Sequence, residues 1–122
     1  AVFGAHLRGQ PLHFQLEELG ARFVEEVYTS DAYRLAALNT TPPKPGLVRH
    51  APGEGAAIVG ELFRLSEAGL GRFLAALPAP MTLTSVELAD GRWVVGFGCT
   101  QDAAADAVDI TGFGGWKAYR AS

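Results

Sequence analysis

The segment MTLTSVELADGRWVVGFGC, residues 81–99, limits the possible folds more than any other part of the chain. Apolar and polar residues alternate on both sides of Asp90-Gly91, a dipeptide that favours a type I′ hairpin turn. Such a turn joins antiparallel strands, whereas parallel strands need a long crossover. The segment therefore predicts an antiparallel hairpin and disfavours a strictly alternating strand–helix architecture.

A second segment, SEAGLGRFLAALP at 66–78, predicts a helix over residues 66–77. Ser66 can cap the first turn, Glu67 complements the positive end of the helix dipole, and Pro78 ends the helix. The apolar face of this helix is expected to contain Leu70, Phe73, Leu74 and Leu77.

The rest of the chain alternates short apolar runs with glycine and proline turns. We expect strands at 1–4, 21–29, 33–39, 46–50 and 56–65, a helix from Pro11 that Gly20 closes, a turn at 52–55, a short helix within 101–110 and a glycine-rich turn into a terminal helix at 110–120. Three prolines make residues 40–46 irregular. The pattern predicts one α+β domain over residues 1–122, with a mostly antiparallel, barrel-like sheet and short flanking helices.

Composition argues against several classes of function. A net charge of −3 gives no reason to expect nucleic acid or an anionic membrane as a partner, and no apolar run approaches the roughly 20 residues of a membrane span. The lone Cys99 excludes an internal disulfide and a cysteine-based zinc site, and suits the cytoplasm. His6, His13 and His50 lack metal-like spacing, and no phosphate or dinucleotide loop is present, so we expect neither metal nor cofactor.

His6 is the first candidate for chemistry. It follows an expected strand end, in a loop where Gly4 lets the chain turn, and scaffolds often present functional groups at such places. An imidazole exchanges protons near neutral pH, and the backbone N–H groups of Ala5 to Leu7 are placed to face an anion. The alternative is an ordinary turn in which His6 only packs.

Glu61 is the second candidate, because it lies inside the apolar run AAIVGELFRL. A charged side chain in a buried strand is costly unless it is paired, so Glu61 faces either solvent or a cavity, and the sequence does not decide between them. Gly60 before it indicates a bulge or the close approach of another backbone.

Other residues have both a functional and a structural interpretation. Arg34 and Lys44 are cations near loops, each either a carboxylate ligand or an ordinary surface charge. Tyr33, Trp116 and Tyr119 either line a pocket or pack in the core.

Two sets of motifs carry a family resemblance. VFGAHLRGQPLHFQL and GELFRLSEAGLGRFLAAL resemble the opening and central segments of the gamma-glutamylcyclotransferase-like fold. GAHLRGQPL, YRLAAL followed by PPKPGLVR, the PAP–ADGRWVVGF region and DITGFGGWKAY are more similar to the C-terminal domain of allophanate hydrolase. This resemblance covers nearly the whole chain, and the GAHL and FGGW segments together are fairly specific.

The resemblance implies an activity and a partner. In that family an amidase domain deaminates allophanate, and the C-terminal domain is held to decarboxylate the product, N-carboxycarbamate. It implies His6 as catalytic histidine, a small dicarboxylate-like substrate and a compact, positive pocket without a cofactor. Together with the motifs above, it makes Gly4, Ala5, Leu7, Tyr33, Arg34, Lys44 and Trp116 the candidate substrate-binding residues.

Three interpretations follow. The first is decarboxylation with His6 as general acid. The second is a non-catalytic assembly module of a larger hydrolase, whose hairpin or terminal helix contacts an amidase domain or a second copy of the domain. The third is a gamma-glutamyl cyclotransferase-like enzyme with Glu61 as base. The GAHL loop carries His6 where cyclotransferases carry a small hydroxyl residue, which favours the first interpretation over the third. His13 is a smaller departure from the family pattern, since the resemblance implies a polar amide residue at that position.

Overall fold

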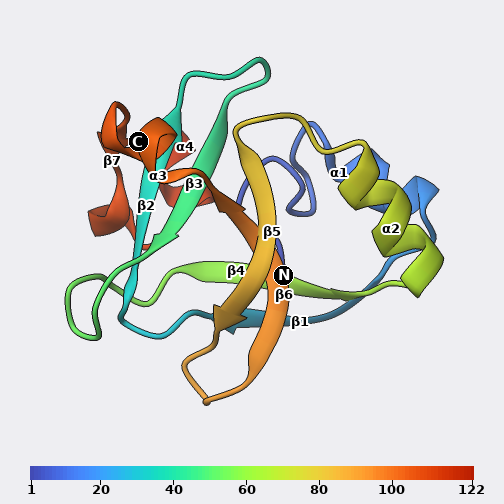
Figure 1. The fold of residues 1–122 in the computed structure, drawn as a ribbon, viewed down its shortest axis with the longest axis horizontal. Coiled ribbons are helices and arrows are strands. Elements are labelled where there is room, and N and C mark those ends of the chain that lie inside the picture. Colours follow the sequence, from blue (N-terminus) through green and yellow to red (C-terminus); the bar gives the residue numbers. More distant parts are fainter.

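A computed structural model describes residues 1–122 and confirms the predicted α+β class, with antiparallel sheets and short helices (Figure 1). The elements follow the order α1 (His13–Glu18), β1 (Arg22–Tyr28), β2 (Tyr33–Leu38), β3 (Lys44–Arg49), β4 (Val59–Arg64), α2 (Glu67–Ala75), β5 (Met81–Glu87), β6 (Trp93–Cys99), α3 (Gln101–Ala105), β7 (Val108–Asp109), the 3₁₀ turn η1 (Thr111–Phe113) and α4 (Trp116–Arg120). None of the helices is both long and apolar enough to cross a membrane.

The strands form three antiparallel sheets, β1–β4, β3–β2–β7 and β5–β6, which surround one core. Isolated bridges connect them: Val2 pairs with Glu61, and Thr29 with Leu88. Helices α1 and α2 lie together on one side of the strands, at the right of Figure 1. The β-structure is thus divided into three small sheets, which are joined by isolated backbone bridges and enclose the core.

The predicted hairpin at 81–99 is confirmed, with Met81 opposite Cys99 and Glu87 opposite Trp93. The predicted turn type is wrong. A type I′ turn needs positive φ at both central residues, but only Gly91 has it, at 92°. The Gly91 N–H donates to the Leu88 carbonyl, and the Leu88 N–H donates to the Arg92 carbonyl. This pattern matches a longer loop in which a left-handed glycine follows an ordinary turn.

The capped helix is also confirmed as α2. The Ser66 hydroxyl oxygen accepts a hydrogen bond of 3.0 Å from the Gly69 N–H. The helix ends at Ala75, two residues earlier than predicted, because the Leu77 N–H turns to the Leu74 carbonyl three residues back. Phe73 is buried as expected, but Leu74 is 54% exposed and does not belong to the buried face.

Four other boundaries differ from the prediction. Residues 1–4 do not form a regular strand, although Val2 bridges Glu61 and Ala1 exchanges backbone hydrogen bonds with Val95 and Phe97 of β6. Helix α1 begins at His13, and β4 begins at Val59. Strand β3 begins at Lys44, inside the segment expected to be irregular. Proline fits there because β3 is an edge strand, whose outer backbone groups need no ladder partner.

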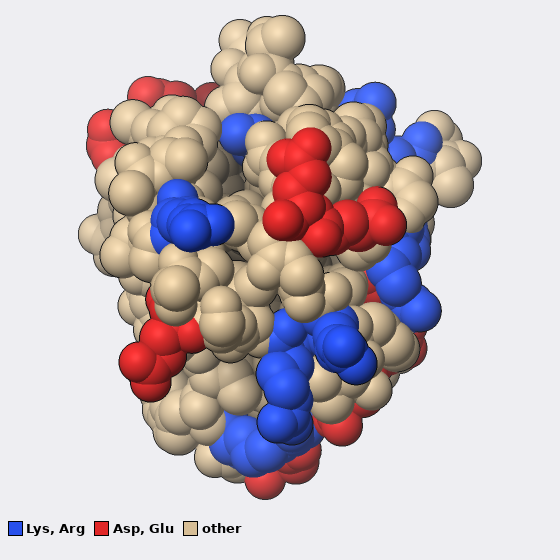
Figure 2. Space-filling model, turned by 90° about the vertical axis from the view of Figure 1, so that its right-hand side faces the viewer, with Lys and Arg blue, Asp and Glu red and all other residues tan.

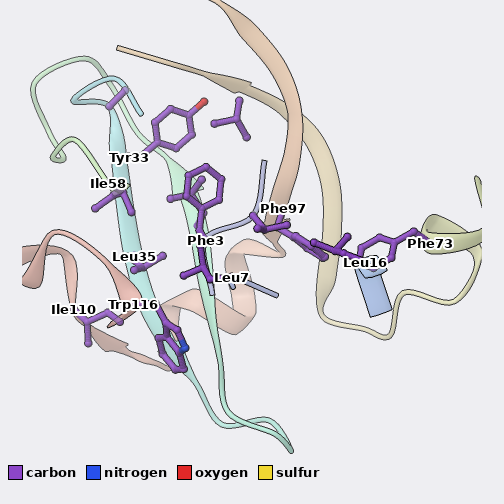
Figure 3. Close-up of a cluster of buried hydrophobic side chains, with 14 residues drawn as sticks. Phe3, Leu7, Leu16, Tyr33, Leu35, Ile58, Phe73, Phe97, Ile110 and Trp116 are labelled. Atoms are coloured by element: carbon purple, nitrogen blue, oxygen red, sulfur yellow. The ribbon is translucent and has the colours of Figure 1, made fainter. Parts of the chain in front are cut away.

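The core explains why the ladders stay together. Figure 3 shows Phe3 and Leu7 from the N-terminal segment among residues of β2, with Ile110 and Trp116 beside them. Leu35 and Ile58 are at most 1% exposed. Full burial of each such side chain contributes about 1.5–3 kcal/mol to folding, so the core anchors the segment that follows Phe3.

Two glycines hold this segment close to the strands. A Cβ atom on Gly4 would overlap the Pro45 ring, and one on Gly60 would lie 2.5 Å from the Phe3 ring and 2.8 Å from the Val2 carbonyl oxygen. The close approach predicted at Gly60 is therefore confirmed. The β-bulge of this ladder lies elsewhere, in β1 between Phe23 and Glu25.

We predict that Gly4→Ala destabilises the protein by about 1–3 kcal/mol, because its methyl group meets a rigid proline ring. The matched change is Gly71→Ala in α2, where no atom lies within 4 Å of the new methyl group. It should stabilise the protein by about 0.5–1 kcal/mol through helix propensity. Urea unfolding of both variants measures the two free energies. Equal effects of the same sign would contradict the packing argument.

Candidate active site

A cavity of 460 Å³ lies where the loop after Phe3 and helices α1 and α2 meet strands β3 and β6. Most of its wall is apolar. Its polar lining consists of the His6, Gln15, Glu18, Lys44 and Arg72 side chains together with the backbone of the loop.

His6 is fixed in the wall of this cavity. The residue is 6% exposed, and its imidazole stacks on Phe97 with ring centroids 5.0 Å apart and planes inclined by 19°. The edge contact with Phe73 has a centroid distance of 5.2 Å. Nε2 lies 2.8 Å from Oε1 of Gln15 on α1. Two aromatic rings and an amide thus hold the imidazole in one orientation.

The Gln15 contact also selects the tautomer. An amide oxygen only accepts hydrogen bonds, so Nε2 of His6 donates to it and keeps its proton in both charge states. Nδ1 is then the nitrogen of His6 that gains and loses a proton. The Nδ1 atom of His13 lies 3.0 Å from the His6 carbonyl oxygen and ties the same loop to the start of α1.

Burial lowers the pKa of His6 below its ordinary value of 6.5, because the charged imidazolium loses hydration. The hydrogen bond to Gln15 partly offsets this effect, and the charges of Lys44 and His13 add to it. The imidazole is therefore neutral at pH 7 in this structure, with an unprotonated Nδ1.

The loop offers free hydrogen-bond donors. The backbone N–H groups of Gly4, Ala5 and His6 have no acceptor within the protein. The Leu7 N–H, which was predicted to face an anion, instead donates to the Gly4 carbonyl at 3.0 Å. Residues 4–6 are buried and line the cavity, so their free N–H groups are suited to a bound anion.

Lys44 supplies a positive charge to the same cavity. The residue is 9% exposed, lines the cavity, and makes no ion pair and no side-chain hydrogen bond. No buried side-chain nitrogen or oxygen lacks a hydrogen-bond partner, so the unpaired Lys44 ammonium still reaches solvent. An unpaired positive charge in a mostly apolar cavity makes the cavity favourable for an anion. The Lys44 charge also lowers the pKa of His6, which indicates that the two groups are close.

Glu61 lies outside this cavity and fits neither predicted alternative, because it is buried and paired. Its carboxylate accepts a hydrogen bond of 2.8 Å from the Arg8 backbone N–H and one of 3.2 Å from Arg8 Nε. The Lys117 ammonium lies 3.7 Å away. The arrangement compensates the charge of Glu61 and joins the loop to β4 and α4.

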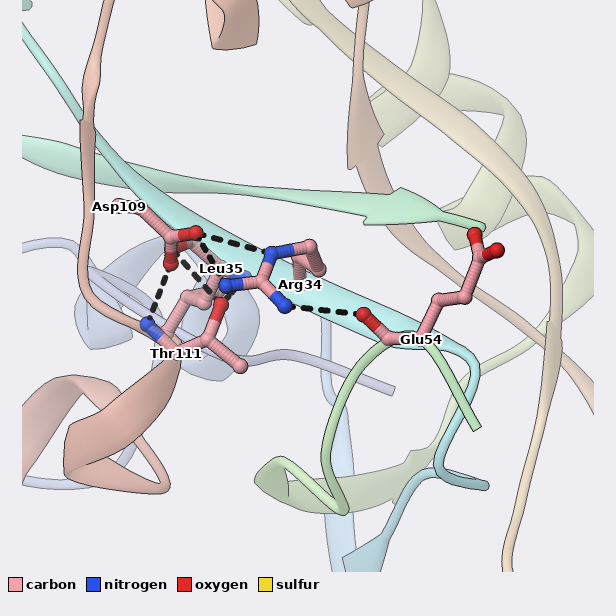
Figure 4. Close-up of polar contacts among 5 residues, drawn as sticks. All are labelled: Arg34, Leu35, Glu54, Asp109 and Thr111. Atoms are coloured by element: carbon pink, nitrogen blue, oxygen red, sulfur yellow. Dashed lines mark hydrogen bonds and ion pairs between the residues drawn. The ribbon is translucent and has the colours of Figure 1, made fainter. Parts of the chain in front are cut away.

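Four of the predicted binding residues lie away from the cavity. Leu7 and Trp116 are in the core at 3% and 2% exposed, and Tyr33 accepts a hydrogen bond of 2.9 Å from the Glu87 N–H. The Arg34 guanidinium binds the Asp109 carboxylate and the Glu54 carbonyl oxygen, and Asp109 also accepts a hydrogen bond from the Thr111 N–H (Figure 4). Of the nine residues predicted for the site, the structure brings together Gly4, Ala5, His6 and Lys44.

Sequence reasoning missed Gln15, Arg72, Phe73 and Phe97 as lining residues. Gln15 had a usable signal, since it lies on the helix that directly follows the GAHL loop. Phe97 had no such signal, because the alternation of apolar and polar residues in the hairpin predicts that Phe97 is buried but not which residue it contacts.

The charges around the helices are mixed. Figure 2 views the side of the molecule that carries α1 and α2, and its basic and acidic side chains form separate small groups, not one continuous field. No group of three or more His, Cys, Asp or Glu side chains is arranged so that it could hold a metal ion.

We predict that the free energy of unfolding falls as pH drops below 6.5. The unfolded chain then takes up a proton on His6 before the folded chain does, because folding lowers this pKa. The contribution of His6 to stability should be complete above that range and decline below it. The N-terminal amine, whose pKa burial lowers from 8.0 to about 6, adds a slope of the same sign that begins at higher pH. Urea unfolding at about pH 7.5 and about pH 5.5 measures the combined slope, and His6→Gln should reduce it. An unchanged slope in the variant would show that other groups cause it.

The chain is similar to known proteins in both sequence and structure. Residues 1–121 match the family "Allophanate hydrolase C-terminal domain". The urea amidolyase of Saccharomyces cerevisiae is 42% identical over 98% of this chain, which spans 7% of that protein. The allophanate hydrolase structure from Kluyveromyces lactis has a TM-score of 0.93 at 41% identity, over 98% of this chain and 20% of that chain.

Shorter proteins share the fold as well. A uropathogenic E. coli-specific protein, c4763, has a TM-score of 0.90 at 30% identity, and the match covers 98% of this chain and 92% of that chain. An AIG2-like protein (GGACT) from Mus musculus has a TM-score of 0.60 at 25% identity, over 85% of this chain and 76% of that chain. The fold is therefore gamma-glutamylcyclotransferase-like, as predicted. With the family match over residues 1–121 and these relatives, the chain belongs to the allophanate hydrolase C-terminal domain family.

Proposed function

We propose that this domain decarboxylates N-carboxycarbamate in urea degradation, with His6 as the general acid. The observation that carries the proposal is the combination, in one cavity, of a buried His6, an unpaired Lys44 and free backbone N–H groups. A small dianion fits these charges, and family membership supports the substrate.

The chemistry requires one proton at one atom. When the bond between nitrogen and one carboxylate breaks, carbon dioxide leaves and the electron pair of that bond goes to nitrogen. A proton from Nδ1 of His6 to that nitrogen gives carbamate and neutral imidazole, and the imidazole takes up a new proton from solvent. Carbamate then takes up a second proton from solvent and breaks down to carbon dioxide and ammonia. General acid catalysis of this kind typically contributes about 10²–10⁴ in rate.

Substrate binding supplies the charge that this step needs. Burial and Lys44 keep His6 neutral in this structure, so the imidazolium must be stabilised by something else. A dianion near Lys44 offsets both effects and raises the pKa of His6. Lys44 and the N–H groups of residues 4–6 hold the carboxylate that stays on nitrogen, since its charge is retained throughout the reaction.

We infer that the domain acts beside an amidase domain that makes its substrate, in the cytoplasm. A homodimer stays a prediction. For the cyclotransferase alternative, the Glu61 carboxylate would have to be a free base, and its pairing with Arg8 and Lys117 argues against this. The assembly module is the outcome that the next experiment distinguishes.

We predict that His6→Gln lowers carbon dioxide release from amidase-generated intermediate by about 10²–10⁴, because glutamine has no transferable proton. His6→Ala should be equally inactive. Truncation of His6 to alanine removes the aromatic contacts of its ring with Phe73 and Phe97. A loss of about 1–3 kcal/mol in stability is therefore expected for His6→Ala, and thermal melting of each variant must accompany the assay.

Glu61→Gln separates the alternatives. If the domain is a decarboxylase, this variant retains more activity than His6→Gln, provided that it stays folded. A cyclotransferase would lose its activity on a gamma-glutamyl amine first at Glu61. If His6→Gln releases carbon dioxide at the parent rate and melts normally, the decarboxylase proposal fails and the assembly module is favoured.

We predict that malonate, which carries two carboxylates like the proposed substrate, raises the pKa of His6. Proton uptake then accompanies binding, so affinity should fall as pH rises through the pKa of the bound form. NMR titration of the His6 ring with and without malonate measures the shift. Resonance changes confined to residues outside 4–9 and Lys44 would contradict this prediction.

A further inference from the structure

Arg72 is a cation of the cavity for which the site described so far has no role. Arg72 and Phe73 on α2 both line the cavity, while Phe73 packs against the His6 ring. Arg72 makes no ion pair and no side-chain hydrogen bond, although Glu18 lines the same cavity. Four other arginines pair with carboxylates, and three do not: Arg22, Arg64 and Arg120. Arg72 differs from these three because it lines the cavity.

Lys44 and Arg72 differ in burial, and this suggests different tasks. Lys44 is nearly buried, whereas Arg72 is exposed and sits at the solvent side of the cavity. A guanidinium offers a planar fork of donors that matches a carboxylate, and an ammonium acts as a point charge. The cavity therefore carries two separate unpaired cations, which suits a ligand with two anionic groups.

We propose that Arg72 is a specificity-determining residue, which binds the second carboxylate of the substrate and so distinguishes dicarboxylates from monocarboxylates. The proposal rests on the function proposed above. Lys44 and the loop N–H groups hold the inner carboxylate beside His6, and Arg72 contacts the outer one.

The outer carboxylate is the one that leaves as carbon dioxide, which predicts a kinetic signature. Its negative charge moves to nitrogen in the transition state, so the contact with Arg72 weakens as the reaction proceeds. An interaction made more strongly with the ground state contributes to binding and not to the chemical step. Loss of Arg72 should therefore raise KM and leave kcat unchanged or slightly higher.

The test compares malonate with acetate on the folded 122-residue domain by calorimetry or NMR titration. Arg72→Gln should weaken malonate binding about 3- to 5-fold, the upper part of the range expected for an exposed charge pair, and change acetate binding less than about 1.5-fold. Arg72→Lys should restore part of the malonate affinity. Lys44→Met should weaken both ligands.

Glu18→Gln is the matched control, because it changes one charge of the same cavity without touching a carboxylate donor. The field of Glu18 acts on both charges of malonate and on one of acetate, so Glu18→Gln should strengthen malonate binding by about the square of the factor for acetate. If Arg72→Gln weakens malonate by no more than the square of its factor for acetate, Arg72 acts only through its general field, and the proposal is overturned. Unchanged malonate binding in Arg72→Gln, or a fall in kcat with KM constant, also overturns it.

Failure of this proposal is separable from failure of the proposed function. If His6→Gln abolishes carbon dioxide release while Arg72→Gln binds malonate normally, only the role of Arg72 is lost. If malonate does not bind the unmodified domain and His6→Gln retains activity, both proposals fall. Because Arg72 is exposed and unpaired, its variants should melt like the parent.

Discussion

The site depends on Glu61, which holds the N-terminal segment at both ends. Its backbone exchanges two hydrogen bonds with Val2, of 2.9 and 3.0 Å, and its carboxylate accepts the Arg8 N–H at 2.8 Å. Residues 3–7 are therefore fixed between two attachment points on one residue of β4. This arrangement leaves the N–H groups of residues 4–6 without internal acceptors. A buried carboxylate is costly by itself, and the contacts with Arg8 and Lys117 compensate its charge.

Strand β3 completes the loop from the other side. Pro45 packs so closely on Gly4 that no side chain fits there, and its neighbour Lys44 brings the buried charge. In the segment PPKPG, Pro45 thus constrains the loop at Gly4, and Lys44 contributes positive charge to the cavity. They do so from an edge strand, where proline removes no ladder hydrogen bond.

Sequence patterns predicted the elements that are determined by residues close to one another in the chain. The hairpin and α2 follow from alternation and a capping serine, and the GAHL loop indicated His6. The cavity could not be predicted in the same way, because Tyr33 and Trp116 have the same apolar signature whether they line a pocket or pack in the core. Lys44 was placed near a loop because proline content does not distinguish an edge strand from a turn. Arg72 shows no sequence signal at all, since only the packing of α2 brings it to the cavity.

The imidazole of His6 must be held in a fixed orientation and must also be able to carry a proton, and its surroundings affect these two requirements in opposite ways. The stacking contact with Phe97 and the edge contact with Phe73 fix the ring but remove it from water, which lowers the pKa of His6 and favours an unprotonated Nδ1. Lys44 lowers that pKa further, yet it also attracts the anion that reverses the effect. In the proposed reaction binding and protonation are coupled, because the Lys44 charge that disfavours the imidazolium in the protein alone also attracts the dianion that would stabilise it. The protonated donor would then form only with a dianion in place, and this selectivity would follow from the presence of Lys44 and His6 in one cavity.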